Sequence, residues 1–259
     1  MDLDLDEIDI QLRTPAEVGR RMIALSVVAH LLAGAGDDAE DGSEEEDNDD
    51  DEPTDAPAGQ RFDWLTWLTQ EQLREALSPS EQALLTRASE LDAPDDLGEE
   101  GTAAEAIGAL AWAARRSELT VLDRGYPYLD LLDLVPSPWD DTSAFLSTLA
   151  LRPESEIASA RESTEILSWR AQVEIERRQA NRGDRADIEA AIRDVASEAA
   201  TAGVAQVGDD GDLVFAGESI RALSDNVISN MAAAARARLR AMNWLCGLGD
   251  WDDPALTDI

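Results

Sequence analysis

Residues 153–180, PESEIASARESTEILSWRAQVEIERRQA, form the longest stretch of helical periodicity in this sequence. Proline is well tolerated at the start of a helix, so Pro153 marks where this helix begins. Small and apolar side chains then recur at spacings of three and four residues, which places them on one face. They are Ile157, Ala160, Thr164, Leu167 and Ala171. The stretch predicts a long central helix that packs this face against the rest of the chain.

Sequence signals for helix starts recur on both sides of this stretch. A hydroxyl residue followed three positions later by glutamate is a capping box, because each side chain binds the other residue's backbone N–H. Such pairs occur at Thr14–Glu17, Ser78–Glu81 and Thr102–Glu105. Later helix starts are predicted at Asp184 and at Ser219 or Ser224.

Residues 204–215, VAQVGDDGDLVF, are the best β-hairpin candidate, with two β-prone runs around a turn at 208–211. A lone hairpin is marginal in water and needs helices to pack against. We therefore predict a mainly α protein, a multi-helix globular domain with one small β-hairpin near residues 204–215.

An acidic segment interrupts this helical pattern. Residues 37–55 contain 13 acidic residues and no large apolar residue, so they have no face that could be buried. We predict an acidic N-terminal tail at residues 1–12 and a single helical domain at 13–259. A disordered acidic insert at about 37–60 interrupts that domain. Three interpretations of the insert stay open: a decoy for a basic partner, a cation sponge, or a solvated insertion without a role of its own.

The composition excludes several enzyme classes. All 21 basic residues are arginine and none is lysine, which excludes Schiff-base chemistry and a P-loop lysine. The single cysteine, Cys246, excludes an intramolecular disulfide and a thiolate zinc cluster, and the single histidine, His30, excludes a two-histidine metal site. We expect no cofactor, and whether the chain is an enzyme stays open.

The net charge of −35 bears on the partners of this protein. Such a charge repels phosphate backbones, so it disfavours direct nucleic-acid binding and favours a basic protein partner. The acidity fits either a high-salt adaptation or a genome that avoids lysine codons.

Residues 22–35 follow Arg20-Arg21 and are apolar, which is similar to a twin-arginine export signal. The run is too short to span a bilayer, and the residues before it are acidic where a signal peptide is basic. We therefore expect a cytoplasmic protein with no membrane contact.

Four other groups suggest chemistry but have simpler interpretations. His30 fits a packed helix histidine better than a general base. Glu162, Glu165 and Glu174 fit Glu–Arg pairing better than a metal site. The acids at 209–212 fit a turn better than a calcium loop, and Arg236 and Arg240 fit helix-dipole compensation better than a phosphate site.

The C-terminal string RLRAMNWLCG at 238–247, followed by DWDD at 250–253, resembles the domain of unknown function 4272 family. Arg20-Arg21, the helix around Trp112 and the string at 168–170 agree with it in order. The resemblance covers roughly residues 13–258 except the acidic insert. It implies a largely helical, soluble bacterial protein without an assigned activity.

The same C-terminal segment supplies the candidate site. We expect Trp244 and Trp251 to lock it against the preceding helix, Asn243 to cap backbone groups, and Asp252 or Asp253 to accept bonds from Arg240. The alternative is a pocket rimmed by Asn243, Trp251 and Asp252. The contact residues are therefore Arg240, Asn243, Trp244, Trp251, Asp252 and Asp253.

Two functions follow, with a weaker third. The first is an uncharacterised protein that acts by protein–protein contacts, as an accessory or immunity-like factor for a basic partner. The alternative is a carboxylate-metal-dependent hydrolase in which Asp252 holds Mg²⁺. A DNA mimic is weaker, because the densest acids lie in the predicted disordered insert rather than on a rigid surface.

Overall fold

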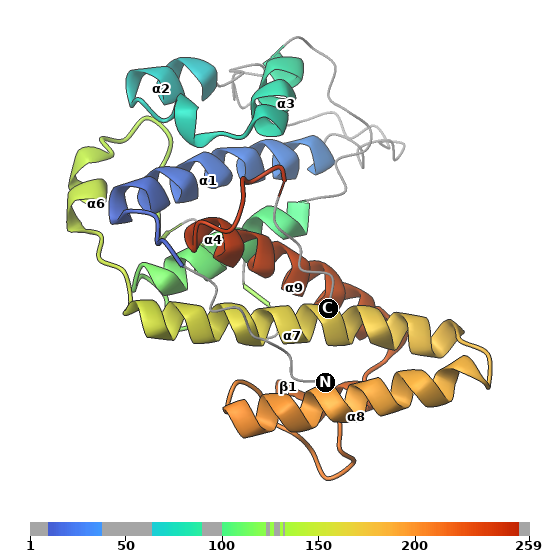
Figure 1. The fold of residues 1–259 in the computed structure, drawn as a ribbon. Coiled ribbons are helices and arrows are strands. Elements are labelled where there is room, and N and C mark those ends of the chain that lie inside the picture. The colour runs from blue at the N-terminus through green and yellow to red at the C-terminus, as the bar shows by residue number, and fades with distance from the viewer. Residues whose placement is uncertain are drawn as a thin grey trace, which may run out of the picture.

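The computed structural model describes residues 10–37, 64–89, 100–122, 125–126, 130–131 and 133–253 (Figure 1). The predicted acidic tail and the acidic insert lie almost wholly outside these residues. Within the described residues the protein is mainly helical, as predicted. The α-helices are α1 (Pro15–Asp37), α2 (Trp64–Gln70), α3 (Pro79–Ser89), α4 (Glu100–Ala113), α6 (Ser143–Thr148), α7 (Glu154–Gln179), α8 (Asp184–Ala202) and α9 (Asp225–Leu245).

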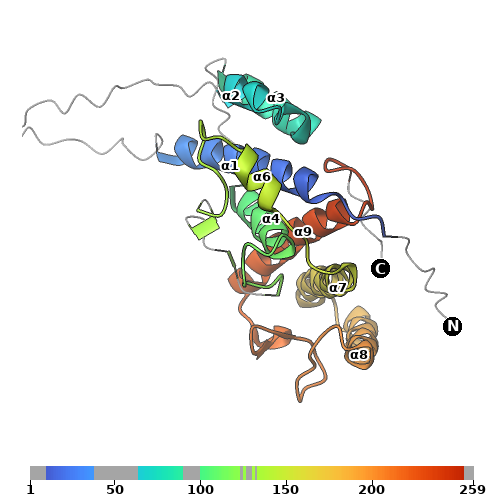
Figure 2. The same ribbon diagram turned by 90° about the vertical axis from the view of Figure 1, so that its left-hand side faces the viewer.

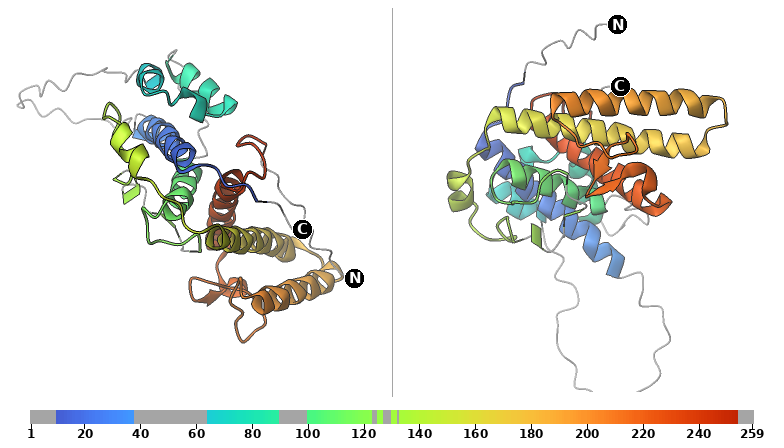
Figure 3. Two further views of the ribbon diagram at one scale, coloured as in Figure 1. Left: turned by 60° about the vertical axis from the view of Figure 1, so that its left-hand side comes forward. Right: turned by 90° about the horizontal axis from the view of Figure 1, so that it is seen from below.

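The helices are stacked in successive layers (Figures 1 and 2). Helices α2 and α3 form one outer layer and cover α1, which in turn packs on α4. Helix α9 lies beside α4, and α7 packs against α9. Helix α8 runs back along α7 and forms the opposite outer layer (Figure 3). The predicted central helix, α7, therefore lies between α9 and α8.

Two of the three predicted capping boxes form. The Thr14 N–H donates to Glu17 Oε2 at 2.8 Å, and the Ser78 N–H donates to Glu81 Oε2 at 2.8 Å. The third prediction was wrong, because α4 begins two residues before Thr102. Glu105 is therefore inside the helix, where its carboxylate binds Arg238 on α9 instead of the helix start.

The small sheet pairs β1 (Val214–Phe215) with β2 (Glu218–Ser219) in antiparallel register. At the predicted turn, residues 207 and 213 form an isolated bridge around the glycines at 208 and 211. The paired strands follow it, with Ala216 and Gly217 at positive φ in the connection. The hairpin was thus expected slightly earlier in the chain than its ladder lies.

The buried apolar residues form two clusters. The larger joins α1, α2, α3 and α4 to the C-terminal half of α9, and the smaller joins α7, α8, the sheet and the N-terminal half of α9. Helix α4 lies in the middle of the larger cluster and is rich in alanine, so its neighbours approach closely. A Cβ atom added at Gly108 would come within 2.3 Å of the Tyr126 ring.

Candidate functional site

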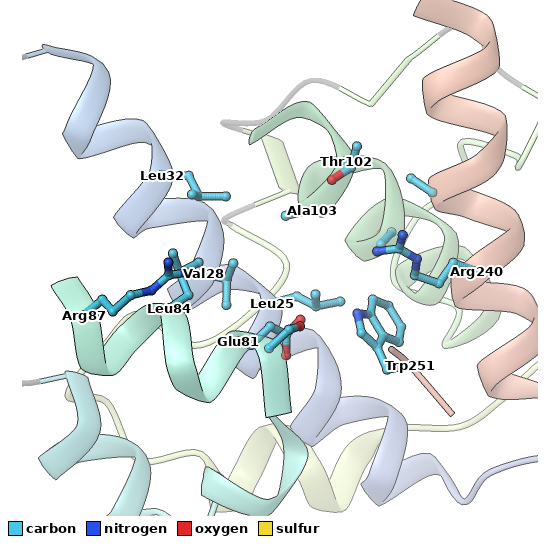
Figure 4. A pocket seen from close by; sticks show the side chains of 13 residues that line it. Leu25, Val28, Leu32, Glu81, Leu84, Arg87, Thr102, Ala103, Arg240 and Trp251 are labelled. Carbon is cyan, nitrogen blue, oxygen red and sulfur yellow. The ribbon is translucent and has the colours of Figure 1, made fainter. Parts of the chain in front are cut away.

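A cavity of about 230 Å³ lies where helices α1, α3, α4 and α9 meet the segment after α9 (Figure 4). Most of its wall is apolar. Its apolar side chains from three of these helices are Leu25, Val28, Leu32, Leu84, Ala103 and Ala106. Trp251 closes one side of the cavity and is 8% exposed.

Two arginines extend into this apolar space from opposite walls, Arg87 from α3 and Arg240 from α9 (Figure 4). Among the described residues, neither guanidinium forms an ion pair or a hydrogen bond. The Arg240 Nε atom is buried and has no acceptor. A buried donor without an acceptor costs roughly 1–3 kcal/mol, so the cavity presents unsatisfied positive charge.

Beside the cavity, a third arginine is paired with a carboxylate. Arg21 is 2% exposed, and its two terminal nitrogens donate to the Glu81 carboxylate at 2.7 Å each. Its guanidinium carbon lies 3.6 Å from the centre of the Trp251 ring, a cation–π contact. Burial lowers the pKa of Arg21, whereas the charge and hydrogen bonds of Glu81 raise it and nearby Arg240 lowers it further. Glu81 therefore neutralises Arg21, whereas Arg87 and Arg240 meet no carboxylate in the part of the chain that the structure describes.

Only two of the six predicted contact residues, Arg240 and Trp251, line the cavity. Trp244 packs edge-on against Trp251, with 5.9 Å between ring centres. This contact holds the terminal segment on α9, as expected. Asn243 is fully buried, and its Oδ1 accepts a hydrogen bond from Arg161 Nε at 2.7 Å.

The expected bond from Arg240 to Asp252 or Asp253 does not form. The Asp252 carboxylate accepts instead from the N–H and the hydroxyl of Ser80, at 2.9 and 2.7 Å. These bonds satisfy a free N–H in the first turn of α3, which is where a helix attracts negative charge. They lower the pKa of Asp252 against the opposing effect of burial. Asp253 is exposed.

The metal-site interpretations gain no support within the described residues, where no three His, Cys, Asp or Glu side chains could hold an ion together. Glu174 binds Arg170, Arg177 and Arg178, and Asp212 turns inward to bind Arg170. His30 Nδ1 lies 2.7 Å from the Ser26 carbonyl oxygen. These residues form structural contacts.

The three arginines of the predicted basic cluster on α9 lie in three different environments. Arg236 is exposed, Arg238 is buried against Glu105 at 2.6 Å, and Arg240 enters the cavity. Sequence reasoning missed Arg87, and it named Arg21 only as part of the Arg20-Arg21 pair, without its buried partner. For Arg21 a signal existed, because the residue lies within an apolar helix face where an arginine needs a buried partner.

Cys246 is buried, and this burial raises the pKa of its thiol to about 11. The thiol therefore stays protonated and unreactive near neutral pH.

A comparison with protein-family models shows which family this chain belongs to. The family described as Domain of unknown function (DUF4272) matches residues 4–191, well over half of the chain. The chain belongs to the DUF4272 family. The matched part of this DUF4272 protein includes Arg20-Arg21, Trp112 and residues 168–170, but it ends before the C-terminal string that first suggested the family. No curated protein and no solved structure matches the chain.

Proposed function

We propose that this protein acts in the cytoplasm by protein–protein contacts, as an accessory or immunity-like factor for a basic partner. The proposal rests on one observation: several arginines are buried and paired with carboxylates of the same chain. Four arginines are at most 5% exposed, and each binds at least one carboxylate of the chain itself: Arg21, Arg161, Arg170 and Arg238.

Internal pairing changes what the surface offers to a partner. Each buried pair cancels within the molecule, so these arginines do not offset the acidic residues that face the solvent. The net charge of −35 then acts outward as a negative field. Such a field raises the association rate of a cationic partner and repels polyanions. No helix among the described residues is long and apolar enough to cross a bilayer.

The test is affinity co-purification of the full chain from its native host at physiological salt, followed by mass spectrometry. We expect a stoichiometric basic partner whose affinity for the purified chain falls as salt rises, because charge attraction is screened. A second chain lacking residues 37–55 shows whether the acidic insert contributes. Absence of a stoichiometric partner, or a partner whose affinity does not depend on salt, would contradict the proposal.

The hydrolase alternative has a separate test. If Asp252 held Mg²⁺, the ion would raise the Tm of the parent chain and leave that of Asp252→Ala unchanged. Against this alternative, both Asp252 carboxylate oxygens already accept hydrogen bonds from Ser80.

A further inference from the structure

The cavity between α1, α3, α4 and α9 combines two properties that the proposed contact function does not use. Its floor is aliphatic, and two guanidinium groups extend into it without an acceptor of their own (Figure 4). The buried arginines elsewhere in the described part of the chain each hold a carboxylate. Arg87 is exposed and therefore solvated, whereas Arg240 is only partly exposed and meets no carboxylate among the described residues, so Arg240 is the anchor that an external anion would use.

We propose that this cavity binds a small organic carboxylate with an apolar body, such as an aromatic or branched-chain acid. The carboxylate lies against the Arg240 guanidinium, because a guanidinium offers paired N–H donors that match its two oxygens. The apolar body lies on Leu25, Val28 and Leu84 of the floor. The anion thereby neutralises the Arg240 guanidinium, which has no carboxylate partner among the described residues.

The size of the cavity limits the ligand. Its volume of about 230 Å³ is below the roughly 300–1,000 Å³ of pockets for drug-sized ligands. A cavity of about 150 Å³ accommodates benzene, so a single ring or a branched chain with one carboxylate fits here. A larger cofactor does not.

The charge of the protein favours a carboxylate over a phosphate group, since a phosphate monoester carries about 1.5 to 2 negative charges at neutral pH and a carboxylate carries one. The overall negative charge does not prevent binding of a monoanion, because exposed charges farther than about 8 Å are largely screened at physiological salt. It does oppose polyanions.

Calorimetric titration of the purified full chain with three probes tests the proposal. Phenylacetate carries the ring and the carboxylate, 2-phenylethanol is its neutral counterpart, and phenyl phosphate carries a phosphate instead. We expect saturable binding of phenylacetate, at least about tenfold tighter than that of 2-phenylethanol, because a hydrogen bond to a charged group contributes more than a neutral one. Phenyl phosphate carries more negative charge, and we expect it to bind more weakly than phenylacetate because the protein itself is strongly negative.

Two variants assign the site, and a third is the control. Arg240→Met weakens phenylacetate binding about tenfold or more, whereas Arg87→Met, on the opposite wall, weakens it less. Neither breaks a bond within the described structure, and Arg87 is exposed, so both variants are expected to fold, which circular dichroism verifies. The control is Arg236→Met, because Arg236 is exposed on the same helix one turn from Arg240 and outside the cavity wall.

The proposal is overturned if phenylacetate shows no saturable binding, if 2-phenylethanol or phenyl phosphate binds equally well, or if folded Arg240→Met binds like the parent. This outcome is independent of the protein partner. Loss of phenylacetate binding with an intact partner complex would separate the cavity from the acidic surface.

Discussion

Arg170 is the residue on which the inner ion-pair network depends. It is completely buried on α7, where its nitrogens donate to Asp212 at 2.6 and 2.7 Å and to Glu174 at 2.9 Å. The two carboxylates come from different parts of the chain, so this guanidinium joins the sheet region to the long helix. Burying three charges is tolerable only because they satisfy one another.

We expect Arg170→Met to lower the free energy of unfolding by about 3–5 kcal/mol, because it leaves Glu174 and Asp212 buried with one shared cation fewer. Urea unfolding followed by circular dichroism measures this loss. The matched control, Arg236→Met, removes an exposed arginine and is expected to change stability by less than about 0.5 kcal/mol. A loss below about 1 kcal/mol for Arg170→Met would show that the network is not a stabilising unit.

Glu174 makes a pH-dependent contribution within the same network. Burial alone would raise the pKa of its carboxyl, but hydrogen bonds from Arg177, Arg178 and Arg170 outweigh burial and lower the pKa from 4.5 to about 2. The folded state therefore favours the ionised carboxylate. This contribution is complete above about pH 5 and is lost as the pH falls from about 4.5 toward 2.

The difference in pKa corresponds to about 3 kcal/mol of stability. We expect the parent chain to lose roughly that much more stability than Glu174→Gln between pH 6 and pH 2, measured by urea unfolding at each pH. If the free energy of unfolding changed with pH in the same way for both proteins, the role of Glu174 would be contradicted.

Helix α3 is held in place by a residue from the far end of the chain. Asp252 caps its first turn through two bonds to Ser80, across 172 positions in sequence. Since α3 carries Arg87 and part of the cavity floor, this cap also positions the cavity wall.

We expect Asp252→Ala to lower the free energy of unfolding by about 1 kcal/mol, which is typical for the loss of a helix cap. Hydrogen exchange of the α3 backbone amides should become faster in the same variant. Asp253→Ala is the matched control, because Asp253 is the exposed neighbour with no bond to α3. Equal exchange in the two variants would mean that Asp252 does not hold α3.

At the scale of the whole molecule, the net charge of −35 opposes folding through self-repulsion. Salt shortens the Debye length from roughly 30 Å at about 10 mM to roughly 3 Å at about 1 M, while buried ion pairs are screened much less. We therefore expect NaCl to stabilise the protein over this range by at least about 1 kcal/mol, or roughly 2–4 °C in Tm. Thermal unfolding at several salt concentrations measures this effect, and a Tm that falls with salt would contradict it.

Much of the helical architecture was predictable from local patterns. Capping at Thr14 and Ser78 and the periodic face of residues 153–180 involve residues within one or two turns of each other, so the sequence carries both partners together. The same reasoning failed at Glu105, which has the spacing of a capping box but a tertiary partner on α9.

The candidate site was predictable only in part. Arg240 and Trp251 were identified from the C-terminal string, whereas Arg87 and the aliphatic floor were not, because nothing local brings α1, α3 and α4 to one place. The predicted partner of Asp252 was also wrong. Pairing with Arg240 and capping of α3 through Ser80 both satisfy the carboxylate, and the sequence does not distinguish them.

The sequence by itself determined a mainly helical, lysine-free and strongly acidic protein, because helix starts, periodic faces and net charge are local or additive properties. Only the tertiary structure decided which arginines are neutralised. Arg238 meets Glu105 across 133 positions and Arg170 meets Asp212 across 42, whereas Arg87 and Arg240 meet no carboxylate among the described residues. Pairing over such distances follows from how the helices pack, which determines where a charge is buried and which acid lies within reach.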